Sequence, residues 1–380
     1  MKIAVNTRLL LKNRLEGIGW FSYETLKRIT QQRTNDEFIF IFDRPWHQDF
    51  IFGNNVTPVK VGPPSRHPFL WYLWFEQSIP TVLKKHQPDL FLSPDGYLSI
   101  NSSVPNLPVI HDINFEHYPR DLPFWYRKYY RHYFPKYARK ATRIATVSEF
   151  SKKDIVDQYG VDSSKIDVVY NGVSDRFKPL TKEEKTMVQK KHTNGNPYFV
   201  FVGALHPRKN IARLLDAFEK FKSSGNYQHN LLLAGKRKWW TSEMESTLNN
   251  MKYKEQVVFE DNLSGTEVAQ AVGSAEAMLY VSTFEGFGIP IIESMKCGVP
   301  VITSDVSSMP EIAGDASLLC NPLSSDSISE QMKRLIHEPQ LAESIIEKGF
   351  KRANDFSWDK TTGLLWESMK NCLLTATKSI

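Results

Sequence analysis

The chain has 380 residues, of which 41% are hydrophobic and 24% charged, a composition ordinary for a soluble globular protein of two domains. Its three cysteines, Cys297, Cys320 and Cys372, are odd in number and do not stand at metal-ligand spacing, which argues against a disulfide scaffold or a zinc ribbon. The first residues predict a strand rather than a signal peptide, and no run of about 18 apolar residues predicts a membrane span. We therefore expect a cytoplasmic protein.

Positive charge is concentrated in one part of the chain. The net charge is +6 at pH 7, and residues 120–153 alone hold ten basic and two acidic side chains. Such a patch suits phospholipid headgroups, a phosphorylated glycan or a nucleic acid. No nucleic-acid recognition motif accompanies the charge, so we expect no nucleic acid as a partner.

Within this basic stretch, residues 124–140 combine aromatic and basic side chains. The favoured interpretation is an amphipathic helix that turns its aromatic side chains to the core and its lysines and arginines to water. The alternative is a peripheral contact with an anionic membrane, at its inner face, where a lipid-linked acceptor would be presented.

Short apolar runs alternate with longer amphipathic ones along the chain, which is typical of parallel α/β sheets. In the first half the predicted strands are 3–5, 37–42, 56–61, 90–92, 109–110, 143–147 and 166–169, and predicted helices include 19–31, 69–84 and 122–138. The pattern lapses in a polar segment that ends in Gly and Pro, which predicts an interdomain connection at 176–196. In the second half the predicted strands are 198–202, 230–233, 257–259, 277–281 and 300–303, with helices at 211–222 and 265–272.

Two weak candidate sites lie in the first half. Gly17 and Gly19 precede a predicted helix, where the backbone can approach an anion, although Ser22 replaces the third glycine of the dinucleotide pattern. His111 follows an apolar pair, and at the carboxyl end of a strand it would point into a ligand crevice. An ordinary glycine turn and a structural histidine would explain the same residues.

A stronger candidate follows the strand at 198–202. Gly203 opens a turn in which Arg208 and Lys209 precede a predicted helix. Two cations beside a helix N-terminus suit a pyrophosphate, because guanidinium, ammonium and helix dipole act on one anion. We favour phosphate binding here over a solvated basic turn.

The most specific pattern spans residues 284–293. Glu285 lies in a glycine-bearing loop with Gly286 and Gly288, and Glu293 follows inside a helix. A carboxylate can accept two hydroxyl protons at once, as the vicinal diols of a sugar require. Two surface glutamates flanking a glycine turn would explain the charges but not the apolar residues between them.

Taken together, these motifs resemble the GT4 family of retaining glycosyltransferases, which have the GT-B fold. The resemblance covers essentially the whole chain and is strongest at 277–322, which looks like the family's Glu-x7-Glu signature with its Pro-Glu and Gly-Asp-Ala continuation. Similar too are TVSEFS at 146–151, YNGV at 170–173 and VGALHPRKN at 202–210. The end of the chain looks like the family's terminal helix.

The resemblance implies an α/β fold with two Rossmann-like, doubly wound domains facing across a cleft that holds the active site. The implied parts are an acceptor-binding domain at 1–175, a linker at 176–196, a nucleotide-sugar-binding domain at 197–355, and a helix at 356–380 that crosses back to the N-terminal domain.

The resemblance also implies roles for single residues. Arg208 and Lys209 would neutralise the diphosphate, and Glu293 would hold the ribose hydroxyls. Glu285 and the backbone of Gly286, Phe287 and Gly288 would hold the transferred sugar, which His111 would face. The remaining implied donor-binding residues are Gly17 and Gly19 near the phosphate, Gly203 in the turn, and Lys236 and Leu263 near the base.

The implied reaction moves a hexose from a GDP- or UDP-sugar to a glycan or lipid-linked acceptor in surface polysaccharide synthesis. Many members carry Arg after the glycine of the turn, where this chain has Ala204, so charge neutralisation rests on Arg208 and Lys209. The Pro-Arg-Lys-Asn turn resembles mannosyltransferase-like members, which favours GDP-mannose. No Asp-x-Asp motif occurs, and we expect neither an essential metal nor a cofactor.

Four other classes compete with this interpretation. A GT-B-fold epimerase would interconvert the nucleotide sugar without an acceptor, and a phosphorylase would need a lysine for pyridoxal, which nothing marks. A non-catalytic two-domain sugar-binding protein would normally need an export signal. A nicotinamide-dependent dehydrogenase is disfavoured, because no glycine fingerprint is followed by an acidic residue about 20 positions later.

Overall fold

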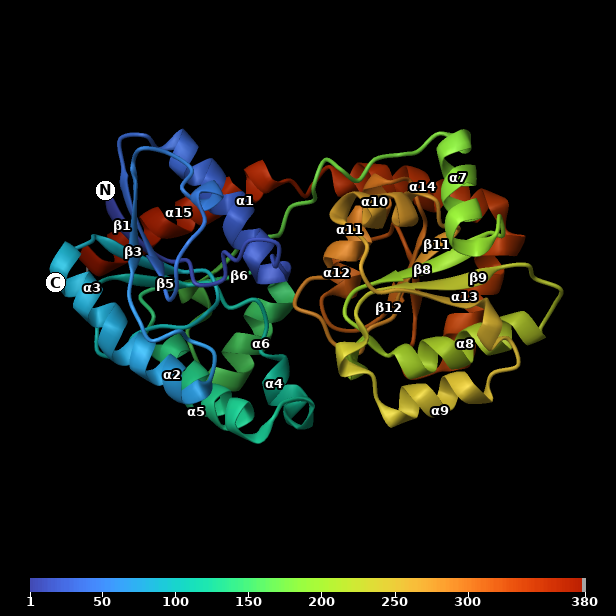
Figure 1. Ribbon diagram of the computed structural model, residues 1–380, viewed down its shortest axis with the longest axis horizontal. Coiled ribbons are helices and arrows are strands. Elements are labelled where there is room, and N and C mark those ends of the chain that lie inside the picture. Colours follow the sequence, from blue (N-terminus) through green and yellow to red (C-terminus); the bar gives the residue numbers. More distant parts are fainter. Residues whose placement is uncertain (378–380) are drawn as a thin grey trace. The chain divides into compact units, whose positions relative to one another are not determined.

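The computed structural model describes residues 1–377 and divides into two compact units, each with its own sheet (Figure 1). The first unit comprises Met1–Gly172 and the segment from Trp358 onward, and the second comprises Val173–Ser357. Both main sheets are parallel, and their helices lie on the faces. Each unit therefore has the layered arrangement that parallel strands require for burial on both faces.

The main sheet of the first unit has the order β3-β2-β1-β4-β5. Its strands are nearly continuous apolar runs, and every residue of β2 after the first is buried. The bounds are β1 Lys2–Asn6, β2 Glu37–Phe42, β3 Val56–Lys60, β4 Leu90–Ser93 and β5 Asn106–Pro108. A second, two-stranded sheet pairs β6 Ile144–Thr146 with β7 Ile166–Val168.

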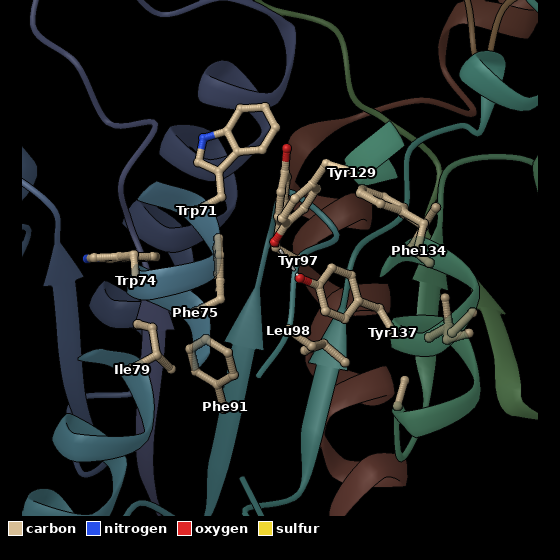
Figure 2. Packing of buried hydrophobic residues seen from close by; sticks show 14 of the residues in the cluster. Trp71, Trp74, Phe75, Ile79, Phe91, Tyr97, Leu98, Tyr129, Phe134 and Tyr137 are labelled. Carbon is tan, nitrogen blue, oxygen red and sulfur yellow. Dashed lines mark hydrogen bonds between the residues drawn. The ribbon is translucent and has the colours of Figure 1, made fainter. Parts of the chain in front are cut away.

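Two cores enclose this sheet. On one side α1 Gly17–Gln32 packs beside α15 Trp358–Thr377, around Phe21, Leu365 and Trp366. On the other side the core is aromatic, and Figure 2 shows Trp71, Phe75 and Tyr97 together within it. The remaining elements are α2 Pro68–Leu73, η2 Trp74–Ser78, α3 Ile79–His86, α4 Asn114–His117, α5 Phe124–Lys140, α6 Glu149–Tyr159 and the short turns η1 Gln48–Phe50, η3 Pro119–Asp121 and η4 Ser163–Lys165.

The sheet of the second unit has the order β10-β9-β8-β11-β12-β13. Its strands are β8 Tyr198–Val202, β9 Asn230–Ala234, β10 Val257–Glu260, β11 Ala277–Tyr280, β12 Val301–Ser304 and β13 Leu318–Cys320. Its helices are α7 Lys182–Thr193, α8 Ile211–Ser223, α9 Ser242–Asn250, α10 Gly265–Gly273, α11 Ile289–Lys296, α12 Met309–Ala313, α13 Ser325–His337 and α14 Pro339–Ala353, with turns η5 Pro207–Lys209, η6 Arg237–Trp239 and η7 Lys254–Gln256. The direction of winding reverses between β8 and β11, and the carboxyl ends at such a point form the usual ligand crevice of a doubly wound sheet.

Three local predictions were wrong. The segment 176–196 is no irregular linker: it belongs to the second unit and carries α7, which a capping box of Thr181 and Glu184 initiates despite its polar sequence. The strand expected at 109–110 lies earlier, at β5, and Val109 makes only an isolated bridge to Ala145. The helix expected over 69–84 is interrupted by the π-helical turn η2.

The helix expected at 356–380 is represented by α15, and residues 378–380 lie outside the described residues. No helix among residues 1–377 combines the length and apolarity that crossing a bilayer requires.

Candidate active site

Two loops of the second unit meet where the sheet changes its winding direction. The loop after β8 carries Arg208 and Lys209, and the loop after β11 carries Glu285. Thr283 joins them, because its backbone N–H and its hydroxyl both donate to the carbonyl of Arg208, at 2.9 and 3.1 Å. Asn210, in the left-handed conformation at the start of α8, donates to the carbonyl of Val281 at 3.0 Å. The two loops are therefore joined directly by hydrogen bonds.

Glu285 lies between the two cations. One carboxylate oxygen is 2.9 Å from a guanidinium nitrogen of Arg208, and the other is 2.5 Å from Nζ of Lys209. Lys209 Nζ also donates to the phenol oxygen of Tyr280 at 2.6 Å and lies 4.9 Å from the centre of that ring. Lys209, Tyr280 and Glu285 are buried. We call these four residues the ion cluster.

The ion cluster holds a net positive charge. Burial by itself would raise the pKa of Glu285, but the charges of Arg208 and Lys209 outweigh it and lower that pKa to about 2. Glu285 is therefore ionised at neutral pH, and one carboxylate faces two cations. Because the excess charge is preorganised in a mostly buried setting, the cluster is suited to a further anion such as a phosphate.

Two serines hold the loop of Glu285. The backbone N–H of Glu285 donates to the hydroxyl of Ser307 at 2.8 Å, and the hydroxyl of Ser308 is 2.9 Å from the carbonyls of both Glu285 and Phe287. Gly288 ends the loop with φ at +102°, in the left-handed region that favours glycine, and α11 begins at the next residue. Gly286 lies buried within the same loop.

Glu293 lies in α11, outside the ion cluster. Burial raises its pKa to about 8, with Arg176 acting in the opposite direction, so its carboxyl group is mostly protonated at neutral pH. The pKa of Tyr280 is raised mainly by burial and by the charge of Glu285, and the charge of Glu293 adds a smaller effect in the same direction. Glu293 is partly exposed, and among residues 1–377 no hydrogen bond holds its carboxyl group. The side chain is therefore available to a ligand.

The remaining candidates of the second unit differ in how they are placed. Gly203 has φ at +141°, and its carbonyl oxygen would lie 1.8 Å from a Cβ at Gly235, so the two turns approach closely. Lys236 has an exposed side chain, and its carbonyl accepts from the N–H of Leu205 at 3.1 Å. Leu263 lies farther along the sheet, in the turn after β10.

The candidates of the first unit pack among its own residues. Gly17 and Gly19 lie within the first turn of α1, and a Cβ at Gly19 would lie 3.1 Å from the carbonyl oxygen of Leu9. The absence of a side chain at Gly19 thus lets the helix approach the backbone of Leu9 closely. His111 lies edge-on to Phe21 of α1, with ring centres 4.9 Å apart, and its Nε2 donates to the carbonyl of Pro94 at 2.9 Å. Burial lowers the pKa of His111, so the ring is neutral at pH 7.

Comparison with known proteins identifies the family. The "Glycosyltransferase Family 4" model matches residues 17–177, and the "Glycosyl transferases group 1" model matches residues 182–352. The O-antigen chain mannosyltransferase RfbU of Salmonella typhimurium is 31% identical over 334 residues, which are 85% of this chain and 88% of that protein. The chain is a family 4 glycosyltransferase.

Two further likenesses extend over the whole glycosyltransferase. The O-antigen chain mannosyltransferase B of Escherichia coli is 26% identical over 377 residues, covering 95% of this chain and 97% of that protein. The crystal structure of Anabaena Alr3699/HepE in complex with UDP and glucose has a TM-score of 0.77 at 17% identity, covering 98% and 100% of the two chains. At that identity the likeness shows the fold, and the expected GT-B fold is confirmed.

Sequence motifs did not indicate three residues of the site in this glycosyltransferase. Tyr280 was expected only as part of a strand, although a polar aromatic residue ending a buried strand beside the glutamate loop was a usable signal. Ser307 and Ser308 reach the loop from the segment after β12. No local pattern could reveal this contact, because it depends on the order of strands in the sheet.

Removing the hydroxyl of Tyr280 is expected to slow turnover more than it weakens donor binding. In Tyr280→Phe, Nζ of Lys209 loses its hydrogen bond to the phenol oxygen and is less firmly positioned. We expect this loss to lower kcat by about tenfold, with a smaller change in KM for the donor. Steady-state kinetics would measure both constants.

Tyr198→Phe is the matched control, because it removes another buried tyrosine hydroxyl of the same sheet, one that donates to the carbonyl of Ala271 at 2.6 Å. Equal losses of kcat in both variants would show that the hydroxyl of Tyr280 acts only through stability.

The raised pKa of Glu293 predicts a pH dependence of stability. The folded protein binds a proton at Glu293 up to about pH 8, whereas the unfolded chain releases it near pH 4.5. Since the folded state then holds more protons, this residue makes the protein progressively less stable as the pH rises from about 4.5 to about 8. Urea unfolding at pH 5, 7 and 9 should show that the free energy of unfolding falls less with rising pH in Glu293→Gln than in the wild type. Identical pH profiles would contradict the raised pKa of Glu293.

Proposed function

We propose that this glycosyltransferase moves mannose from GDP-mannose to a growing glycan, free or lipid-linked, in the synthesis of a surface polysaccharide. The relatives named as O-antigen chain mannosyltransferases support the sugar and the kind of acceptor. The observation that carries the proposal is the ion cluster, because a preorganised excess of positive charge at the carboxyl edge of a doubly wound sheet suits a nucleoside diphosphate.

Arg208 and Lys209 are proposed to bind the diphosphate and to assist its departure. When the bond between the anomeric carbon and the phosphate oxygen breaks, negative charge grows on the leaving diphosphate. Cations already held in place by Glu285 and Tyr280 stabilise this developing charge without reorganising. The same contacts are weaker in the ground state, so they lower the barrier rather than only tighten binding.

The carboxyl groups are proposed to have separate duties. Glu293, which has no partner within the described chain, would bind the ribose hydroxyls. Glu285 would first hold the two cations and then offer its remaining acceptor capacity to the transferred sugar, with the backbone of the loop 286–288. Lys236 and Leu263 are assigned to the base. His111 and the turn at Gly17 and Gly19 keep the donor roles that the family resemblance implies.

Configuration at the anomeric carbon is proposed to be retained. No residue of the ion cluster is a free nucleophile, since both oxygens of Glu285 already accept from cations. Attack of the acceptor hydroxyl on the face that the diphosphate leaves, with its proton passing to the departing phosphate, needs no enzyme nucleophile. Because Arg208 and Lys209 supply the positive charge, the reaction is also proposed to need no divalent metal.

Nucleotide binding and transfer test this proposal in two steps. Thermal-shift titration with GDP, UDP and ADP at equal concentrations should show the largest stabilisation with GDP, because the ligand that binds the folded state most tightly stabilises it most. Transfer assays with GDP-mannose and UDP-glucose, with and without EDTA, should then show mannose transfer that EDTA leaves unchanged. A preference for UDP would contradict the donor, loss of activity in EDTA would contradict metal independence, and conversion of the nucleotide sugar without an acceptor would indicate an epimerase.

A further inference from the structure

Four large aromatic side chains of the first unit point into solvent. Phe69 is 64% exposed, Tyr72 40%, Phe124 56% and Trp125 59%. All four belong to α2 or to the first turn of α5. Leaving several large apolar side chains in water is unfavourable relative to burial, so their presence on neighbouring helices calls for an explanation. We call these four residues the aromatic face.

The two helices are in direct contact. The rings of Trp71 on α2 and Tyr130 on α5 stack 5.5 Å apart, and the rings of Tyr72 and Tyr133 lie 6.2 Å apart. The phenol of Tyr126 donates to the carbonyl of Arg66 just before α2, at 3.3 Å. Figure 1 shows the two helices side by side at the edge of the unit. The four exposed side chains therefore lie on two helices that pack against each other.

The fold accounts for only part of the aromatic content of α5. Tyr129, Phe134 and Tyr137 are buried in the core, where Figure 2 shows them near Tyr97. The favoured interpretation of the run 124–140, a helix with aromatic side chains inside, is correct for these residues. Phe124 and Trp125 take no part in that core, so they remain unexplained by folding.

The charged side chains of α5 have a single sign. The 17 residues of α5 include six lysines and arginines and no acidic residue. Lys128 lies 5.7 Å from the ring centre of Trp125, and Lys136 lies 5.5 Å from that of Tyr133. Arg131 pairs with Glu116 at 2.9 Å, whereas Lys128 and Lys136 face solvent without an acidic partner in the described part of the chain.

We propose that the aromatic face and the lysines of α5 dock on the surface of an anionic lipid bilayer. Aromatic side chains prefer the boundary between headgroups and acyl chains, and nearby lysines attract acidic headgroups. A second copy of the chain is a poorer occupant, because a two-fold interface would bring the same positive surfaces together. The inference depends on the proposed function only for its purpose, which is to bring the enzyme to a lipid-linked acceptor.

Vesicle co-sedimentation of the full chain tests the docking. The probes are vesicles of phosphatidylcholine alone and vesicles with about one-quarter phosphatidylglycerol. We expect binding at least about tenfold stronger to the anionic vesicles. The double variants Phe69→Ala with Trp125→Ala and Lys128→Ala with Lys136→Ala should each lose most of that binding.

Matched controls come from α7, whose Met187 is 65% exposed and whose Lys182 and Lys190 are also exposed. Met187→Ala, and Lys182→Ala with Lys190→Ala, should sediment like the wild type. All variants should keep the circular dichroism spectrum and the transfer rate to a soluble acceptor.

Three results would overturn the docking proposal: equal sedimentation with neutral and anionic vesicles, unchanged sedimentation of the aromatic-face variants, or a dimer in solution that those variants dissociate. The nucleotide titration separates this proposal from the proposed function. Stabilisation by GDP without vesicle binding would contradict only the docking proposal. Vesicle binding without stabilisation by any nucleotide would contradict only the donor assignment.

Discussion

Lys209→Ala is expected to lower kcat by about two to three orders of magnitude, the scale observed when one preorganised contact to a developing charge is removed. Nζ of Lys209 is fixed by Glu285 at 2.5 Å and by Tyr280 at 2.6 Å, so its charge is in place before the diphosphate departs. Steady-state transfer kinetics and single-turnover rates would separate the loss in chemistry from any loss in donor binding.

The matched control is Lys220→Ala in the helix that follows the same turn. Lys220 is partly exposed, lies 2.9 Å from Asp326, and does not belong to the ion cluster. We expect its kcat to equal that of the wild type. If Lys209→Ala also kept the wild-type kcat while remaining folded, the role of the ion cluster in the reaction would be excluded.

Glu285→Gln should have the largest effect on stability. The substitution keeps the shape of the side chain but removes the carboxylate charge that contacts both Arg208 and Lys209 in a buried site. We expect the free energy of unfolding at pH 7 to fall by about 3 kcal/mol, at the low end for breaking a buried ion pair because Arg208 is partly exposed. Urea unfolding would measure the change.

A bound anion should reverse this effect in part. GDP should raise the melting temperature of Glu285→Gln by more than that of the wild type, because its phosphates replace the lost negative charge. Glu330→Gln is the control, since Glu330 pairs with Lys333 on an exposed helix surface and should change stability little. Loss of stability that GDP does not restore would show that Glu285 supports the loop without affecting a phosphate site.

The same variant has an expected pH signature. The pKa of Glu285 is about 2 when folded and near 4.5 when unfolded, so its contribution is complete above pH 4.5 and is lost as the pH falls towards 2. The difference in free energy of unfolding between the wild type and Glu285→Gln should therefore shrink as the pH falls from 4.5 towards 2.

The strands were the most predictable part of the fold. The predicted strands 37–42 and 198–202 coincide with β2 and β8, because buried parallel strands are short, continuous apolar runs. Elements that depend on polar capping contacts or on local backbone geometry were harder to predict. α7 depends on its capping box and on packing against α10 rather than on an apolar stripe. The π-helical turn η2 interrupts a helix without leaving a recognisable pattern in the sequence.

The chemistry of the site was easier to predict than its contacts. Glycine-bearing turns drew attention to Arg208, Lys209 and Glu285, but their direct pairing joins residues 76 or more positions apart and follows from the adjacency of β8 and β11. The raised pKa of Glu293 likewise depends on burial that its position in the sequence does not reveal. The close approach of Gly19 to the carbonyl oxygen of Leu9 also depends on tertiary structure that the sequence does not reveal.

The central claim is that the ion cluster binds the diphosphate of a nucleotide sugar. A crystal structure of the glycosyltransferase with GDP tests it most directly. We expect the β-phosphate within hydrogen-bond distance of Arg208 and Lys209, and the ribose hydroxyls within that distance of Glu293. A phosphate bound elsewhere, with the contacts of Glu285 to both cations unchanged and no ligand beside them, would contradict the account.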